Sequence, residues 1–295
     1  MRHVVVGAGG FIGKALLAAL PNASGYDLPD WDVRDPRQCN AIDLAGATVW
    51  HLAAINSATA LFYEDPELVL DVQIRGTLNM LDACREQGAH TFVLFSSSEV
   101  FQDATTPTHE IVPLVVPDIR NPRFSYGGSK IAAELMVHWS ALPRCLTLRP
   151  FNAYGGAQKP GHIVPDLIRR IDETPHGHSV EVHGPADARR AFIYIDDFVA
   201  GCVAIAEKHA VDEKCRETYN VGAMASTSIG RLAELLSGVM GREDVLFSYG
   251  PAPHGSVEDR CPDTSKIRFG TGWGAKVGLR EGLARTVAAY REAKG

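Results

Sequence analysis

A tyrosine and a lysine stand one helical turn apart in the stretch FSYGGSKIAAEL, which runs from Phe124 to Leu135. Tyr126 and Lys130 would share one face of a helix, because residues i and i+4 are neighbours. A tyrosine has a pKa of about 10 and is a poor base at neutral pH. An ammonium about 4 Å away would stabilise the phenolate by at most roughly 4 kcal/mol, or about three pKa units, at an effective dielectric constant of about 20. The pair therefore indicates either proton transfer by the phenol or an ordinary surface pair on an amphipathic helix.

A run of three serines ends an apolar stretch in FVLFSSSEVF. In a parallel sheet, ligands gather outside the carboxyl ends of the strands, so Ser96, Ser97 and Ser98 are predicted to meet a substrate hydroxyl. Glu99 follows them directly. A serine-rich turn is the alternative, but it would not explain the nearby tyrosine and lysine.

The first strand is predicted to end in a glycine loop. Gly7, Gly10 and Gly13 form a GxxGxxG spacing in GAGGFIG, between an apolar β-branched run and a helical pattern. Glycines there allow a diphosphate to approach the backbone, and the helix N-terminus offers free N–H groups. About 20 residues later Asp27 ends a short second strand, where a carboxylate can bind both ribose hydroxyls of an adenosine and repel a 2′-phosphate. The loop thus predicts NAD in preference to NADP; a turn residue is the alternative for Asp27.

The elements that must hold these residues alternate along the first half of the chain. Short apolar runs such as HVVVGA and TFVLFSS alternate with helical patterns such as PELVLDVQIRGTLNMLDACREQG. This predicts an α/β fold, a Rossmann-type parallel sheet flanked by helices and joined by right-handed crossovers. After about residue 152, loops rich in Gly, Pro and His surround further helices. We expect an NAD-binding domain from 1–152 plus about 190–222, and a smaller interleaved C-terminal substrate domain from about 153–189 plus 223–295.

Composition excludes several classes of protein. The 295 residues carry a net charge of −6, which argues against a nucleic-acid binder. No apolar run is long enough for a signal peptide or membrane span, so a cytoplasmic location is expected. The six cysteines form no CxxC pair and are expected to be buried apolar residues, with no metal site. His176 and His178 are expected in a solvated loop.

The ordered motifs resemble one family over nearly the whole chain. The resemblance rests on the segments GAGGFIG, HLAA, SSSEVF, YGGSK, RPFNAYG, RRAFIYIDD, ETYNVG and DRCPDTSK. They occur in the order and spacing of the extended short-chain dehydrogenase/reductases. The nearest branch is the NAD-dependent epimerase/dehydratase family that acts on nucleotide sugars.

This resemblance implies a role for each matching position. The implied catalytic residues are Ser97, Tyr126, Lys130 and, for some reactions, Glu99. The implied NAD-binding residues are Gly7, Gly10, Phe11, Ile12, Gly13, Asp27, Asp32, Val33, Leu52, Ala53, Ala54, Tyr126 and Lys130. The implied sugar-nucleotide-binding residues are Ser98, Asn152, Arg190 and Arg260.

Several reactions remain open within the family. The epimerase, dehydratase and decarboxylase reactions begin when Tyr126 takes a proton from a sugar hydroxyl, usually on C4, and a transient 4-keto sugar forms. Return of the hydride to the other face gives an epimer, which we rank first. If the C5 proton is removed and water is lost from C6, the enzyme is a 4,6-dehydratase. If carbon dioxide is lost, it is a uronic-acid decarboxylase. Net delivery of a hydride to a keto sugar would make it a reductase. Glu99 keeps the C5 chemistry open, although it could simply anchor a loop.

Two further expectations follow from the resemblance. Members commonly form homodimers through two helices per subunit, here within Pro66 to Gln87 and from about Tyr126 onward. The second helix carries Ile131, Leu135 and Trp139 in a stripe that could face a partner or the sheet. A non-catalytic NAD-sensing protein is the alternative from another functional class, against which the intact catalytic residues argue.

Overall fold

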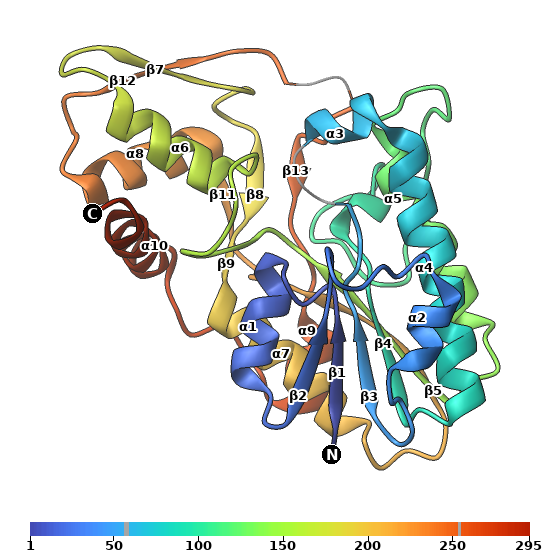
Figure 1. Cartoon of the computed structure of the whole chain (residues 1–295). Coiled ribbons are helices and arrows are strands. Elements are labelled where there is room, and N and C mark those ends of the chain that lie inside the picture. Colours follow the sequence, from blue (N-terminus) through green and yellow to red (C-terminus); the bar gives the residue numbers. More distant parts are fainter. Residues whose placement is uncertain (56–58, 253–254) are drawn as a thin grey trace.

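The computed structural model describes residues 1–55, 59–252 and 255–295. Within them, six parallel strands form the central sheet in the order β10-β5-β4-β3-β1-β2. The strands are β1 (His3–Val6), β2 (Ala23–Tyr26), β3 (Thr48–His51), β4 (Thr91–Phe95), β5 (Arg144–Pro150) and β10 (Cys215–Val221). Helices lie on both faces of this sheet (Figure 1). The predicted Rossmann-type α/β fold is confirmed.

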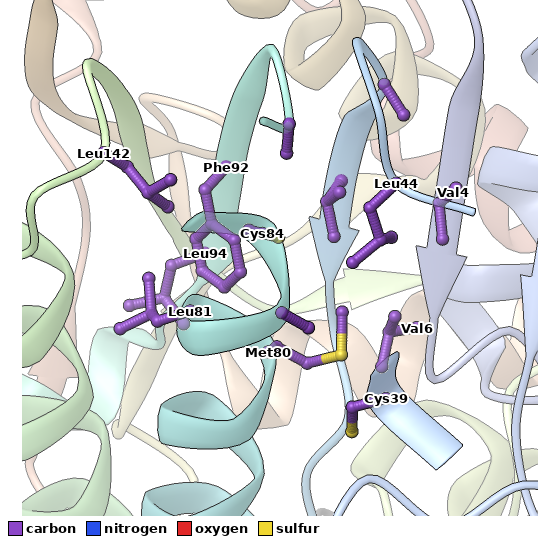
Figure 2. Close-up of a cluster of buried hydrophobic side chains, with 14 of the residues drawn as sticks. Val4, Val6, Cys39, Leu44, Met80, Leu81, Cys84, Phe92, Leu94 and Leu142 are labelled. Carbon is purple, nitrogen blue, oxygen red and sulfur yellow. The ribbon is translucent and has the colours of Figure 1, made fainter. Parts of the chain in front are cut away.

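Alternating strand residues build two separate cores. Val4 and Val6 point to one face and Val5 to the other, as the twofold period of a strand requires. The first face is covered by α2 (Pro36–Ala41), α4 (Pro66–Gln87) and α5 (Phe124–His138). Figure 2 shows this core, in which Cys39 and Cys84 pack as small apolar side chains.

The opposite face is covered by α1 (Phe11–Ala19), α7 (Ile195–Lys208) and α9 (Ser265–Thr271). Its core joins Val5 and Trp50 of the sheet to Phe198 of α7 and Ile267 of α9. Helix α9 thus packs on the sheet, although it lies in the range assigned to the substrate domain. The division into two domains stays a prediction, which we would revise by placing α9 with the NAD-binding part.

A third core lies beside the sheet. It is formed by α6 (Ile163–Glu173), α8 (Ile229–Met240) and α10 (Leu279–Lys294), with the parallel pair β7 (Ser179–Val182) and β12 (Leu246–Tyr249). A small sheet, β11-β8-β13, adjoins it, built from β8 (Arg189–Ala191), β11 (Ser226–Ser228) and β13 (Asp259–Arg260). The small sheet contains three arginines, Arg189 and Arg190 on β8 and Arg260 on β13.

Short elements connect the two parts. They are α3 (Thr59–Glu64), the 3₁₀ turn η1 (Ser98–Val100), and the parallel pair β6 (Ala153–Tyr154) and β9 (Ile193–Tyr194). Helix α4 shows how the sequence sets its own limits: the Asp65 carboxylate accepts the Leu68 N–H, Pro66 opens the helix, and Gly88 ends it in the left-handed conformation. In the described ranges, every helix is too short or too polar to cross a membrane.

Candidate active site

One pocket of about 420 Å³ lies where β1, β4 and β5 end. Fourteen of the predicted site residues line it: Gly7, Gly10, Phe11, Ile12, Gly13, Leu52, Ala54, Ser97, Ser98, Glu99, Tyr126, Lys130, Asn152 and Arg260. Parallel strands place the chain that follows each of them at one edge of the sheet. The fold therefore brings the glycine loop, the serines and the tyrosine–lysine pair to one place.

The glycine loop has the shape that a dinucleotide requires. Gly7 has a φ of 90°, and a side chain on it would lie 2.7 Å from the Ala53 nitrogen, so glycine is needed there. Gly10 is the N-cap of α1, whose first N–H groups face the pocket edge. The Asp27 carboxylate accepts the Gly9 N–H at 2.7 Å and so lies directly against the loop. These residues fit the diphosphate and ribose of NAD.

Five predicted residues do not line the pocket within the described residues. They are Asp27, Asp32, Val33, Ala53 and Arg190. Asp32 forms a salt bridge with Arg34 at 2.6 Å, and Val33 is buried in the first core. Arg190 donates to the backbone carbonyls of residues 189, 257 and 258, so its guanidinium braces the small sheet instead.

Tyr126 sits at the start of α5 and is 5% exposed. The Phe62 ring stacks on it with centroids 5.0 Å apart and planes 11° from parallel. Burial raises the pKa of Tyr126, Glu99 raises it further, and a hydrogen bond with the Ser97 side chain lowers it. The net direction is thus upward in this structure, opposite to the predicted lowering, because desolvation of the phenol is the largest cause.

Lys130 is 2% exposed and lies beneath the tyrosine. Its ammonium is 5.6 Å from the Tyr126 ring centroid and donates to the Phe95 carbonyl at 2.7 Å. Burial lowers the pKa of Lys130 to about 7, while the charge of Glu134 raises it. Lys130 therefore titrates near neutrality, in the range where a group can exchange protons.

Glu99 meets arginines from two distant parts of the chain. Its carboxylate forms a short ion pair with Arg260 of β13, lies 3.8 Å from Arg123, and accepts the Gln102 side-chain N–H at 3.0 Å. Burial raises the pKa of Glu99, but the arginines outweigh it and hold the pKa at about 2. Close approach of α5 makes this cluster compact, since a side chain on Gly127 would lie 2.8 Å from the Glu99 carbonyl.

Sequence reasoning missed Arg123, which lines the pocket. It is the N-cap of α5, and a cation at a helix N-terminus is unfavourable unless an anion compensates it. A basic residue at the expected start of this helix was therefore a signal in the sequence from which Arg123 could have been identified. Phe62 and Gln158 also line the pocket, and the sequence offered no pattern that would find them.

A cluster of His209, Asp212 and Cys215 lies at the amino end of β10, and its ligand atoms are within 4.8 Å of one another. His209 Nδ1 is 2.6 Å from the Asp212 carboxylate and Nε2 is 2.9 Å from the Tyr219 hydroxyl. Both ring nitrogens are thus engaged by protein groups. This cluster is remote from the strand ends that form the pocket.

Known proteins share both the sequence pattern and the fold. A GDP-6-deoxy-D-mannose reductase of Pseudomonas aeruginosa is 30% identical, over 96% of this chain and 94% of that protein. A UDP-glucuronate 4-epimerase of Thermodesulfobacterium geofontis is 28% identical, over 82% of this chain and 71% of that protein. The crystal structure of a Thermotoga maritima UDP-glucose 4-epimerase with UDP-glucose matches with a TM-score of 0.84 and 23% identity, over all of both chains. The sequence model of one family matches residues 3–222. The chain therefore belongs to the NAD dependent epimerase/dehydratase family.

Proposed function

We propose that the protein is an NAD-dependent epimerase of a nucleotide-linked sugar, acting through a transient 4-keto sugar. The observation that most directly supports this proposal is one pocket lined by the glycine loop and by Ser97, Tyr126 and Lys130. The family is NAD dependent, and the named relatives act on nucleotide sugars. Asp27 beside the glycine loop supports NAD over a cofactor with a 2′-phosphate.

Each side chain of the catalytic group has a distinct task in this proposal. Bound NAD supplies the hydride acceptor and a positively charged ring. Ser97 holds the substrate hydroxyl by a hydrogen bond, and Tyr126 takes the hydroxyl proton and later returns it. Lys130 stabilises the phenolate that forms and orients it. Phe62 covers the phenol and keeps water from it.

The environment of Glu99 favours epimerisation over dehydration or decarboxylation. A base that removes the C5 proton, or an acid that delivers one, needs a pKa nearer to neutrality. Arg260 and Arg123 hold the pKa of Glu99 at about 2, far below that range. We therefore assign Glu99 the task of orienting the two arginines for the diphosphate of the substrate, which guanidinium groups bind well.

Reduction of a keto sugar is the second candidate. It is supported by the 30% identity to a GDP-6-deoxy-D-mannose reductase. A reductase and an epimerase use the same tyrosine and lysine and differ in whether the hydride is returned to the product. Consumption of NADH in proportion to product is thus the distinguishing property.

The test is incubation of the purified protein with UDP-, GDP-, dTDP- and CDP-linked sugars and their keto forms, followed by mass spectrometry. An epimerase gives an isobaric product without net use of NADH. Loss of water, loss of carbon dioxide, or stoichiometric NADH oxidation would each replace the proposal by the corresponding alternative. Tyr126→Phe should bind NAD and lose turnover. If no sugar is converted while NAD binds, a non-catalytic NAD-sensing role is supported.

A homodimer through α4 and α5 extends the proposal. The two helices pack against each other, and Leu78, Leu135 and Trp139 are 46%, 58% and 79% exposed. Ile131, the first residue of the predicted stripe, instead packs against the cluster of Val100 and Phe101. Large exposed apolar side chains on adjacent helices are typical of an interface.

A further inference from the structure

A carboxylate on α5, that of Glu134, lies one turn beyond Lys130. Glu134 is four residues after Lys130, so the two side chains share a helix face. It is 9% exposed, which is unusual for a glutamate and requires partners. The catalytic proposal above does not use it.

Three hydrogen bonds from two side chains, Ser96 and Arg149, hold the Glu134 carboxylate in place. The Ser96 hydroxyl donates a short hydrogen bond to its Oε1 atom, and Ser96 directly precedes Ser97. Arg149 of β5 donates from Nε to Oε1 at 2.9 Å and from Nη2 to Oε2 at 2.6 Å. Arg149 is itself fixed, since Nη1 donates to the Glu110 carbonyl at 2.8 Å and the guanidinium lies over the Phe101 ring at 4.8 Å. The carboxylate therefore has one position.

Lys130 needs a nearby anion to keep its charge. Its ammonium donates a hydrogen bond to a neutral carbonyl, that of Phe95, and burial of an ammonium favours loss of its proton. Among the titratable groups around Lys130, His51 on β3 is buried, and its pKa is lowered to about 3, so it is neutral at pH 7. Glu99 on η1 is neutralised by its arginines. Tyr126 is a neutral phenol at pH 7, and Arg149 repels the ammonium.

We propose that Glu134 is a positioning residue that keeps Lys130 protonated and anchors the serine strand end through Ser96. Arg149 aligns the carboxylate, and the fixed unit of Ser96, Glu134 and Arg149 acts on the reaction only through Lys130 and Ser97. The inference rests on the proposed function for its catalytic meaning, but the protonation of Lys130 can be measured without turnover.

The experiment is an NMR titration of isotope-labelled lysine side chains in the intact chain, with Lys130 assigned from the Lys130→Arg variant. Glu134→Gln should lower the pKa of Lys130 from about 7 by about one or more, which corresponds to at least about a fivefold loss of protonated lysine at pH 7. Glu134→Asp, which keeps the charge, should largely restore it. Glu217→Gln removes a carboxylate of β10 that pairs with Lys266 of α9 and serves as the matched control, without effect on Lys130.

Because Glu134→Gln leaves a buried arginine without its partner, it could fail to fold. The double variant Glu134→Met with Arg149→Met removes the pair as a unit, a replacement that proteins tolerate, and decides the matter in that case. It removes Arg149 along with the carboxylate, and should still lower the pKa of Lys130, because Glu134 is the charge that raises this pKa in the structure. An unchanged pKa in the folded variants would overturn the inference. Loss of turnover in Tyr126→Phe would be unaffected by that outcome, so the two proposals fail separately.

Discussion

Two arginine–carboxylate pairs, one formed by a residue of helix α5 and one at the pocket, are built differently. The inner pair, Glu134 with Arg149, has side chains 10% and 5% exposed, and its partners are 15 residues apart in adjoining elements. The pocket pair, Glu99 with Arg260, has side chains 26% and 6% exposed and joins residues 161 positions apart. The inner pair joins α5 to the central strand β5, whereas the pocket pair bridges η1 and β13.

The difference teaches which pair can respond to a ligand. All three donor groups of Arg149 are engaged, by Glu134 and the Glu110 carbonyl. Within the described residues, Arg260 Nε and Arg123 Nε have no hydrogen-bond partner, so the pocket pair retains binding capacity. A complete buried network rigidifies a site, and an incomplete one leaves groups for recognition. We infer that the inner pair fixes the catalytic group and the pocket pair receives the substrate.

The largest effect, on turnover, is expected at Lys130, the residue on which the inner pair is proposed to act. Lys130→Met should lower turnover by about 10³-fold, because the phenolate loses its stabilising cation. It should not destabilise the fold. The pKa of Lys130 is about 7 in the structure and 10.5 in the reference state, so the folded chain releases this proton as pH rises through that window. Its contribution to stability is lowest below pH 7 and increases toward pH 10.5.

Urea denaturation at pH 6 and pH 9 measures this dependence. The wild type should gain stability between the two values relative to Lys130→Met, with the variant equal or more stable at pH 6. A variant that is inactive and also strongly destabilised at pH 6 would show that Lys130 is chiefly structural.

Breaking the two pairs separately should sharpen the contrast in stability. Arg149→Met leaves a buried carboxylate without its partner and should cost about 3–5 kcal/mol of unfolding free energy. Arg260→Met leaves a carboxylate that is partly exposed and still near Arg123, and should cost less. Chemical denaturation gives both values; equal losses would mean that the two pairs do not differ as described.

Glu99→Gln should divide the kinetic constants. If Glu99 orients arginines, KM should rise by about tenfold, the value of one charge-assisted hydrogen bond, with kcat changed by no more than about threefold. If Glu99 is a base at C5, kcat should fall by about 10² or more. Steady-state kinetics on the substrate found by the sugar panel separates the two, and Glu217→Gln is the surface control.

The smallest effect on the monomer is expected on the outer side of α5. Trp139→Glu changes a side chain that is 79% exposed, so unfolding free energy should stay within about 0.5 kcal/mol. Light scattering after size exclusion should show a shift from dimer to monomer. A wild type that is already monomeric, or a variant that remains dimeric, would contradict the proposed interface.

Much of the site could be predicted because it is local. The glycine loop follows one strand, the serines follow another, and Tyr126 and Lys130 share one helix, so spacing and strand ends sufficed to bring them together. The predicted cofactor contacts of Asp32 and Val33 stay a prediction, because side-chain direction after β2 depends on packing: Val33 lies in the core and Asp32 pairs with Arg34. Nothing in the local pattern distinguished those outcomes.

By itself, the sequence determined the fold class, the glycine loop and the proximity of Tyr126 and Lys130, because these depend on periodicity and on contacts between near neighbours. Only the tertiary structure decided the charge states. Burial raises the pKa of Tyr126, on which the Phe62 ring stacks, and the pKa of Glu99 is held at about 2 because Arg260, distant in sequence, lies against it. A pKa is set by burial and by charges near in space, and neither is encoded in a short stretch of chain.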